Sequence, residues 1–134
     1  MTTDDLVVDV SQDWLQACSV QERFMRNSVG DHCNVDYSAR CRQMRVLGGD
    51  CYDFSSFSDG RLAMLVGDAS GKGVAAALLM ANIQASLRTA SIFTGDDLAA
   101  LLRIVNLQVC AASLDSRYAT LVCGVLTAAI LRAF

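Results

Sequence analysis

The sequence predicts a single α+β domain, and three observations support this prediction. The chain has 134 residues, which fits one domain of ordinary size. Apolar residues make up 53% of it and charged residues only 19%, which excludes an intrinsically disordered chain. Helical and strand-like patterns form separate groups along the sequence and do not alternate one by one. We therefore expect one domain over residues 1–134, with antiparallel sheets and flanking helices.

Charge and cysteine content exclude several functional classes. The net charge of −3 disfavours a nucleic-acid-binding protein, which needs a basic face. None of the six cysteines belongs to a C-x-x-C motif, so neither a zinc ribbon nor a thioredoxin-like redox pair is expected. No signal peptide is visible, and no apolar stretch reaches the roughly 20 residues of a membrane helix. The sequence therefore predicts a cytoplasmic protein with reduced thiols and no membrane contact.

One helix and one strand are expected before the glycine-rich region. Ser11 can cap a helix that runs to about Ser28, because apolar residues recur in it every three or four positions. The segment Asn34–Met44 alternates between apolar and polar side chains, which is typical of a half-buried strand.

Two further strands are expected to form a hairpin. They cover Cys51–Phe57 and Arg61–Asp68, and the dipeptide Asp59-Gly60 between them favours a tight turn that needs positive φ. The unbroken apolar run Leu62–Val66 predicts that the second of these strands is covered on both faces.

Two helices and a strand complete the predicted order. The first helix, about Val74–Ala90, has an apolar stripe that we expect to face the core, formed by Val74, Ala77, Leu78, Ala81 and Ala85. The second helix, about Asp96–Ser113, has acidic residues in its first turn, which suits the helix dipole. Its expected core stripe consists of Leu98, Leu101, Leu102, Val105 and Val109. The last strand is expected at Arg117–Leu126.

The residues best suited to chemistry flank the open end of the hairpin. Gly48-Gly49-Asp50 precedes its first strand, and the glycine-rich segment Gly67–Gly73 contains Asp68. Folding the hairpin brings Asp50 and Asp68 to the same end, where two carboxylates can hold one or two hard cations. The alternative interpretation is a glycine-rich hairpin with two solvated aspartates at its base.

The pairing register decides between these interpretations. A two-residue turn pairs Ser58 with Arg61 and Cys51 with Asp68, and Asp50 then points to the other side of the sheet. A three-residue loop with a bulge pairs Tyr52 with Asp68. In that case Asp50 and Asp68 share a face as diagonal neighbours, roughly 7–8 Å apart.

Other chemical interpretations of this region are weaker. A P-loop needs four residues between its first glycine and Gly-Lys, whereas only three separate Gly67 from Gly71. Ser70 has no histidine near it in the sequence to act as a base, so it is not expected to be a nucleophile. Lys72 is more typical of an exposed loop lysine than of a phosphate ligand. Cys51 is more typical of a packed thiol than of a reactive one.

Several segments together resemble the SpoIIE/RsbU-type branch of the PP2C (PPM) serine/threonine phosphatases. They are Gly48–Phe54, Asp59–Leu62, Gly67–Ala81 and Arg117–Leu121, and the resemblance extends over about Trp14–Leu126. It implies an αββα sandwich, in which two antiparallel sheets lie between two helical layers. The chain looks like the N-terminal part of such a domain.

The resemblance also implies an activity and a site. Asp50, Asp68 and the backbone carbonyl of Ala69 would hold two Mn²⁺ or Mg²⁺ ions, which activate a water for attack on phosphoserine or phosphothreonine. The implied active-site loop residues are Gly49, Ser70, Gly71, Lys72 and Gly73. The implied substrate is a phosphorylated regulatory partner protein of the anti-sigma-factor-antagonist type, in stress or sporulation signalling. The two helices after the loop resemble the pair that couples regulatory input to the metal site.

Members of this family carry two further metal-binding aspartates downstream, whereas the last acidic residue here is Asp115. The chain therefore resembles an incomplete domain with open strand edges and uncovered apolar faces, and we expect it to form a homo-oligomer, most simply a dimer. The alternative function is a catalytically incomplete interaction module that self-associates.

Overall fold

In the computed structural model, helices and antiparallel strands occur in separate groups, so the fold is α+β as predicted. The structure describes residues 3–25, 29–32, 35–43, 47–57, 59–95, 97–112, 117–127 and 130–133. The elements follow in the order α1 (Thr3–Phe24), β1 (Val29–His32), β2 (Val35–Ser38), β3 (Asp50–Ser56), β4 (Leu62–Ala69), α2 (Val74–Thr94), α3 (Leu98–Ala112), β5 (Ala119–Thr127) and β6 (Ile130–Ala133).

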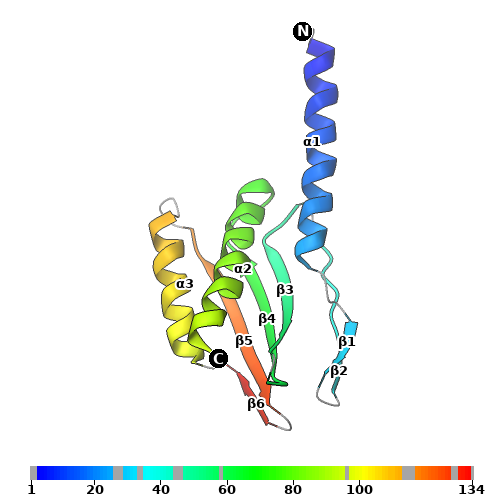
Figure 1. Cartoon of the computed structure of the whole chain (residues 1–134). Coiled ribbons are helices and arrows are strands. Elements are labelled where there is room, and N and C mark those ends of the chain that lie inside the picture. Colours follow the sequence, from blue (N-terminus) through cyan, green and yellow to red (C-terminus); the bar gives the residue numbers. More distant parts are fainter. Residues whose placement is uncertain are drawn as a thin grey trace.

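The main sheet has four antiparallel strands in the order β3-β4-β5-β6 (Figure 1). β4 lies in the middle, between β3 and the strand β5 that follows the two helices α2 and α3. β1 and β2 form a separate two-stranded antiparallel sheet. The segment Gly67–Gly73 therefore lies at the point where the chain leaves the sheet for α2.

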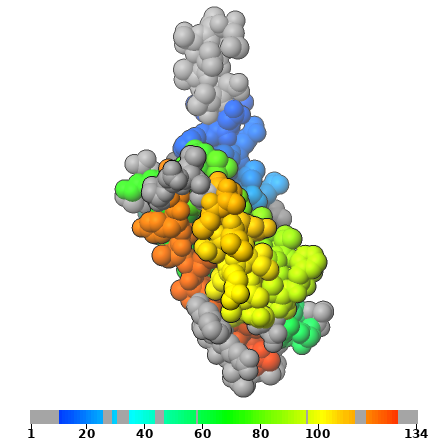
Figure 2. Space-filling model, turned by 90° about the vertical axis from the view of Figure 1, so that its left-hand side faces the viewer, coloured from blue at the N-terminus to red at the C-terminus, as the bar shows by residue number. Residues whose placement is uncertain are grey.

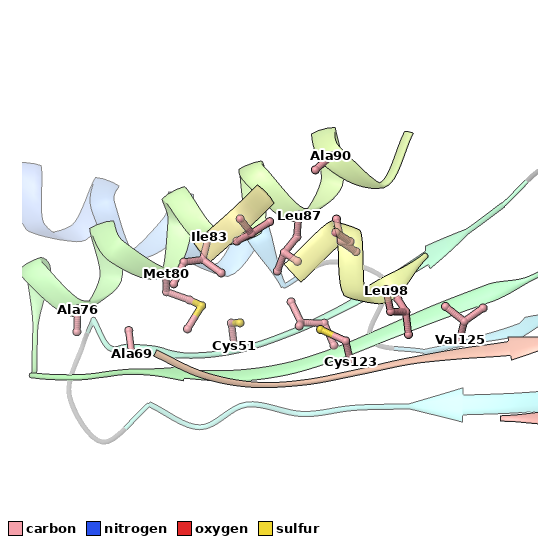
Figure 3. Packing of buried hydrophobic residues seen from close by; sticks show 13 residues of the cluster. Cys51, Ala69, Ala76, Met80, Ile83, Leu87, Ala90, Leu98, Cys123 and Val125 are labelled. Atoms are coloured by element: carbon pink, nitrogen blue, oxygen red, sulfur yellow. The ribbon is translucent and has the colours of Figure 1, made fainter. Parts of the chain in front are cut away.

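The hydrophobic core lies between the main sheet and the helices α2 and α3. Figure 3 shows Met80 and Ile83 of α2 pointing toward the sheet, where Cys51 and Cys123 contribute to the same cluster. In the space-filling view, α3 lies across the front of the molecule between β5 and α2 (Figure 2). The helices thus seal one face of the sheet, which we call the helix face.

The opposite face of the sheet, which we call the outer face, is covered by the described residues at one end only. At the hairpin end, the Tyr37 ring of β2 lies 4.4 Å from the Phe54 ring of β3, and Leu62 is completely buried. Toward the other end, Val66 and Val122 are each 62% exposed. The prediction that Leu62–Val66 is covered on both faces is therefore wrong for Val66, because the segment after β2 borders this end without covering it.

α1 runs away from the sheet, and its C-terminal turn is tied to the segment before β3 (Figure 1). The Gln21 side chain donates a hydrogen bond to the Gly48 carbonyl (2.6 Å) and accepts one from the Gly48 N–H (3.3 Å). The Tyr52 hydroxyl donates to the carbonyl of Met25 (2.8 Å). Within the described part of the chain, no helix has the length and apolar character that a membrane crossing requires.

Several predicted element boundaries differ from the structure. α1 begins at Thr3, so Ser11 lies inside the helix and does not cap it. The predicted strand at 34–44 is much shorter: β2 shows the expected alternating burial, but residues 39–43 have no regular pairing. β1 and β6 have no counterpart in the prediction, because their strand structure comes from pairing with a neighbour rather than from a periodic pattern. Five predicted ends lie outside the described residues: Ser28, Asn34, Met44, Asp96 and Ser113.

The core-facing side of α2 is not the predicted one. Val74 and Leu78 of the predicted stripe are 39% and 66% exposed. The buried residues of this helix are Ala76, Met80, Ile83, Gln84, Leu87 and Ala90. α2 carries apolar side chains on several sides, so their spacing alone does not select the face. In α3 the predicted stripe is correct, since its five residues are buried or pack against the core cluster, and Asp97 caps the helix by accepting a hydrogen bond from the Ala100 N–H (2.9 Å).

Candidate functional site

The turn between β3 and β4 sets the geometry of the site at the other end of the hairpin. The Phe57 N–H donates to the Arg61 carbonyl (2.8 Å), and the Gly60 N–H donates to the Phe57 carbonyl (3.1 Å). Gly60 has a φ of 86°, the left-handed conformation that glycine adopts without strain. These bonds define a three-residue loop between Phe57 and Arg61, of which Ser58 lies outside the described residues.

The loop produces a register that differs from both predicted ones. Asp50 lies directly opposite Asp68, whereas the two predicted registers paired Asp68 with Cys51 or Tyr52. The difference arises because the pair that closes the loop is Phe57–Arg61 and not Ser58–Arg61. Directly opposed residues of an antiparallel pair point to the same side, with their Cβ atoms about 4.5–5.5 Å apart. The two aspartates therefore share the outer face, closer together than the diagonal arrangement would place them, and both are exposed.

A close approach of two backbone segments lies directly beside this pair. The Ala69 N–H donates to the Gly49 carbonyl (3.1 Å). A Cβ atom at position 49 would lie only 2.5 Å from the carbonyl oxygen of Ala69, so the approach requires glycine. This arrangement brings the Ala69 carbonyl next to the chain segment that carries Asp50.

The glycine-rich loop after β4 is held against the start of β5. The Ser70 N–H donates to the Tyr118 carbonyl (2.7 Å), and the Ser70 hydroxyl accepts from the Tyr118 N–H (2.9 Å). The Arg117 guanidinium donates to the Ser70 carbonyl (3.3 Å) and lies against Gly71, whose φ of 100° favours glycine. Ser70 therefore has a structural role in this loop, and Lys72 is exposed.

The segment before the site is fastened to the backbone of Asp50. The Gln43 side-chain amide donates to the Asp50 carbonyl (2.7 Å) and also contacts the Cys41 sulfur (3.3 Å). Burial, followed by the charge of Asp50, raises the pKa of the Cys41 thiol. Residues 39–43 thus run past the edge strand β3 at the level of the aspartates.

An open cavity of about 430 Å³ lies over the aspartate end of the outer face. Its walls carry two acidic residues, Asp50 and Asp68, and two basic residues, Arg40 and Arg42. The remaining lining residues are Ala39, Cys41, Cys51, Tyr52, Val66, Gly67, Thr120, Leu121 and Val122. The predicted site did not include the two arginines, although their spacing on the polar side of the predicted strand was a signal for them.

The sulfur of Cys51 is directed to the helix face, so the prediction of a packed thiol is confirmed (Figure 3). Burial, followed by the negative charge of Asp53, raises the pKa of the Cys51 thiol to about 12. The thiolate is therefore absent near neutral pH, and Cys51 is unsuited to nucleophilic chemistry.

A half-buried ion pair that was not predicted from the sequence supports the site from the helix face. The Arg88 guanidinium of α2 donates to both carboxylate oxygens of Asp53 (2.6 and 2.9 Å), and also to the carbonyl of Phe24 (2.9 Å). Its contact with Asp53 raises the pKa of Arg88. This pair joins β3, α2 and the end of α1. No sequence signal links Asp53 to Arg88, because the pairing depends on which face of α2 is buried.

The donor atoms at the aspartate pair suit hard divalent cations. Two carboxylates and one backbone carbonyl supply oxygen ligands only, which favours Mg²⁺ or Mn²⁺ over zinc. Among the described residues, no group of three or more His, Cys, Asp or Glu side chains comes together to hold a metal ion. Asp50, Asp68 and the Ala69 carbonyl thus fit such ions when water molecules supply the remaining ligands.

Comparisons with known proteins decide the family. The family described as stage II sporulation protein E (SpoIIE) matches residues 58–130, which is more than half of the chain. The chain belongs to the SpoIIE family. The match includes the hairpin turn, Asp68, the glycine-rich loop, both core helices, β4 and β5, whereas β3 with Asp50 lies outside it.

Two solved structures are similar in fold to this SpoIIE-family chain. The RsbU and RsbW domains of Rv1364c from Mycobacterium tuberculosis match 63% of the chain at 32% identity, with a TM-score of 0.53. The SiaA-PP2C domain of Pseudomonas aeruginosa matches 93% of the chain with a TM-score of 0.62, and at 19% identity this likeness concerns the fold alone. The chain covers 23% of the first structure and 50% of the second. No match was found among curated proteins.

Proposed function

We propose that the chain, taken as one domain over residues 1–134, acts as a metal-dependent phosphatase on phosphoserine or phosphothreonine of a regulatory partner protein. The observation that supports this most strongly is the register that sets Asp50 directly opposite Asp68 on the outer face. Membership of the SpoIIE family and the PP2C fold supports a phosphatase role in signalling.

In this proposal Asp50, Asp68 and the Ala69 carbonyl hold two Mn²⁺ or Mg²⁺ ions. When bound, such ions lower the pKa of a coordinated water and offset charge on the phosphoryl oxygens. Gly49 permits the close approach of the Ala69 carbonyl. Ser70 fixes the loop through its two bonds to Tyr118, so the ligand positions are set by rigid backbone. Gly71, Lys72 and Gly73 would complete the proposed active-site loop, in which Lys72 is exposed.

The proposed partner is a phosphorylated protein of the anti-sigma-factor-antagonist type. One solved relative contains an RsbW domain together with its RsbU domain, which supports a regulatory protein as substrate. We place this activity in the cytoplasm, where thiols stay reduced, and the cysteines that the structure describes are free.

Phosphate release from a phosphoserine protein tests the proposal. We expect release by the wild-type chain to require Mn²⁺, and the Asp68→Asn variant to lose it. The matched control is Asp13→Asn, which removes the same charge from an exposed position on α1 and should leave release unchanged. Equal release by the Asp68→Asn variant would show that the pair does not hold the catalytic ions.

The alternative proposal is a catalytically incomplete module that self-associates. It is favoured by the exposed apolar residues of the outer face, Val66 and Val122. It is also favoured because the described residues bring no more than two carboxylates together at the site. Light scattering after gel filtration would then give a dimer, with no phosphate release at saturating Mn²⁺. A monomer would contradict self-association.

A further inference from the structure

The cavity over the outer face has a basic wall that the proposed metal ligands do not explain. In the segment 39–43, Arg40 and Arg42 are exposed, whereas Ala39 and Cys41 between and beside them are partly buried. Alternation of this kind is typical of an extended segment, in which residues two apart lie about 7 Å from each other on one side. The segment is held in place, because Gln43 is bonded to the Asp50 carbonyl.

Both guanidinium groups are available to a ligand. Within the part of the chain that the structure describes, neither Arg40 nor Arg42 takes part in a hydrogen bond or an ion pair. By contrast, Arg88, Arg117 and Arg61 are all engaged with acceptors of the chain itself. Arginine binds carboxylates through two parallel hydrogen bonds, so an unengaged pair is suited to acidic side chains.

The floor of the same cavity is apolar. Val66 of β4 and Val122 of β5 lie on it side by side, since they are directly paired in the sheet, and each is largely exposed. An extended peptide directs alternate side chains to opposite sides. Such a peptide can therefore place acidic side chains on the arginines and apolar ones on the valines.

We propose that this cavity, which we call the groove, binds an extended acidic segment of the phosphoprotein substrate, with carboxylates two residues apart paired to Arg40 and Arg42. This inference rests on the proposed function, since the phosphorylated residue of the same segment would lie at Asp50 and Asp68. The two arginines thereby select substrates with acidic residues beside the phosphorylation site.

The charges of the groove make this recognition dependent on metal. Without cations, the negative charges of Asp50 and Asp68 offset the positive charges of Arg40 and Arg42, so the cavity attracts an acidic peptide only weakly. Divalent cations bound at the aspartates make the net charge of the cavity positive. Peptide and metal should therefore strengthen each other's binding.

Binding of two fluorescent peptides tests the inference without any turnover. The first peptide contains glutamate, alanine, glutamate, valine and phosphoserine in that order, and the second has glutamine in place of both glutamates. With Mn²⁺ present, the Arg40→Gln, Arg42→Gln double variant should bind the glutamate peptide about tenfold more weakly than the wild-type chain does, as expected for two exposed ion pairs. Its affinity for the glutamine peptide should change little. The control double variant Arg23→Gln, Arg103→Gln removes the same charge from α1 and α3 and should bind both peptides as the wild-type chain does.

The outcomes separate this inference from the proposed function. Equal loss for both peptides, no loss for either, or no binding of the glutamate peptide to the wild-type chain would overturn the inference. A preference for glutamate that depends on Arg40 and Arg42, but is the same with serine in place of phosphoserine, would support binding of an acidic segment in the groove and contradict the phosphatase site. Circular dichroism of the variants checks that they are folded.

Discussion

The two faces of the main sheet are built for different tasks from the same strands. On the helix face, Cys51, Leu65 and Cys123 are at most 8% exposed and pack under α2 and α3. On the outer face, their sequence neighbours Asp50, Val66 and Val122 are exposed around an open cavity. Because side chains alternate along a strand, each functional residue is next to a core residue.

This comparison separates stability from function within the same strands. Substitutions on the helix face should lower the free energy of unfolding, because they remove buried contacts. Substitutions on the outer face should change metal or substrate binding while they leave stability nearly unchanged.

The largest expected change in the free energy of unfolding comes from a substitution in the core of the helix face. Ile83 is 1% exposed, so Ile83→Ala should lower the free energy of unfolding by about 3–4 kcal/mol. Val66→Ala on the outer face should cost less than about 1 kcal/mol. Urea unfolding of the two variants measures both values, and similar losses would mean that the outer face is covered in solution.

The half-buried ion pair between Arg88 and Asp53 should also contribute to stability from the helix face. Arg88→Leu leaves the Asp53 carboxylate, which is 8% exposed, without its bidentate partner. We expect a loss of about 2 kcal/mol, below the usual value for a fully buried pair, because the Arg88 side chain is 44% exposed and therefore screened by solvent. Arg103→Leu on the exposed side of α3 is the control and should change the unfolding free energy by less than about 0.5 kcal/mol. A loss as small as that of the control would show that the pair contributes little to stability.

Metal binding should stabilise the chain through the outer face alone. Free Mn²⁺ at about 100 times its Kd should raise the free energy of unfolding by about 2.7 kcal/mol, because only the folded chain brings Asp50 and Asp68 together. The Asp68→Asn variant should show no such increase in a thermal melt. If the melting temperature of the variant rises as much as that of the wild-type chain, the ion binds elsewhere.

The smallest expected effect is the pH dependence that Cys51 causes on the helix face. Its pKa is raised from 9.0 to about 12 in the folded chain, so the unfolded chain loses the thiol proton first. Stability should therefore be complete below pH 9 and fall as the pH rises from 9 toward 12. At one pH unit above the unfolded pKa, this amounts to about 1.4 kcal/mol. For the Cys51→Ala variant, the free energy of unfolding measured with urea should fall less steeply between pH 8 and 10 than for the wild-type chain. An equal slope would assign the pH dependence to other groups.

The sequence predicts local structure well where one strong periodicity exists. The stripe of α3 repeats at helical spacing and is confirmed, and Asp59-Gly60 correctly marks the hairpin turn. In α2, leucines and alanines occur on several sides, so the buried face is decided by what the sheet offers and not by the helix itself. β1 and β6 are too short to show a pattern before they find a partner strand.

The candidate site shows the same limit. The motifs bring Asp50 and Asp68 to one end of a hairpin, but the side on which each carboxylate lies depends on a single hydrogen-bonded pair at the turn, Phe57–Arg61. Local sequence is compatible with several loop lengths, so it cannot fix this choice. The contacts of Arg88 and of Gln43 could not be predicted from the sequence, because they join segments that meet only in the folded chain.

The three-residue loop at Gly60 has a consequence for how this chain tolerates insertions and deletions. The loop lies at the opposite end of a seven-residue strand from Asp50, about 23 Å away along the backbone. If a residue inserted there moved the closing pair Phe57–Arg61 by one position, β3 would slide by one residue and Asp50 would turn toward the core. The length of a distant surface loop thus helps to determine on which face of the sheet Asp50 lies. We expect this loop to tolerate a change in composition far better than a change in length.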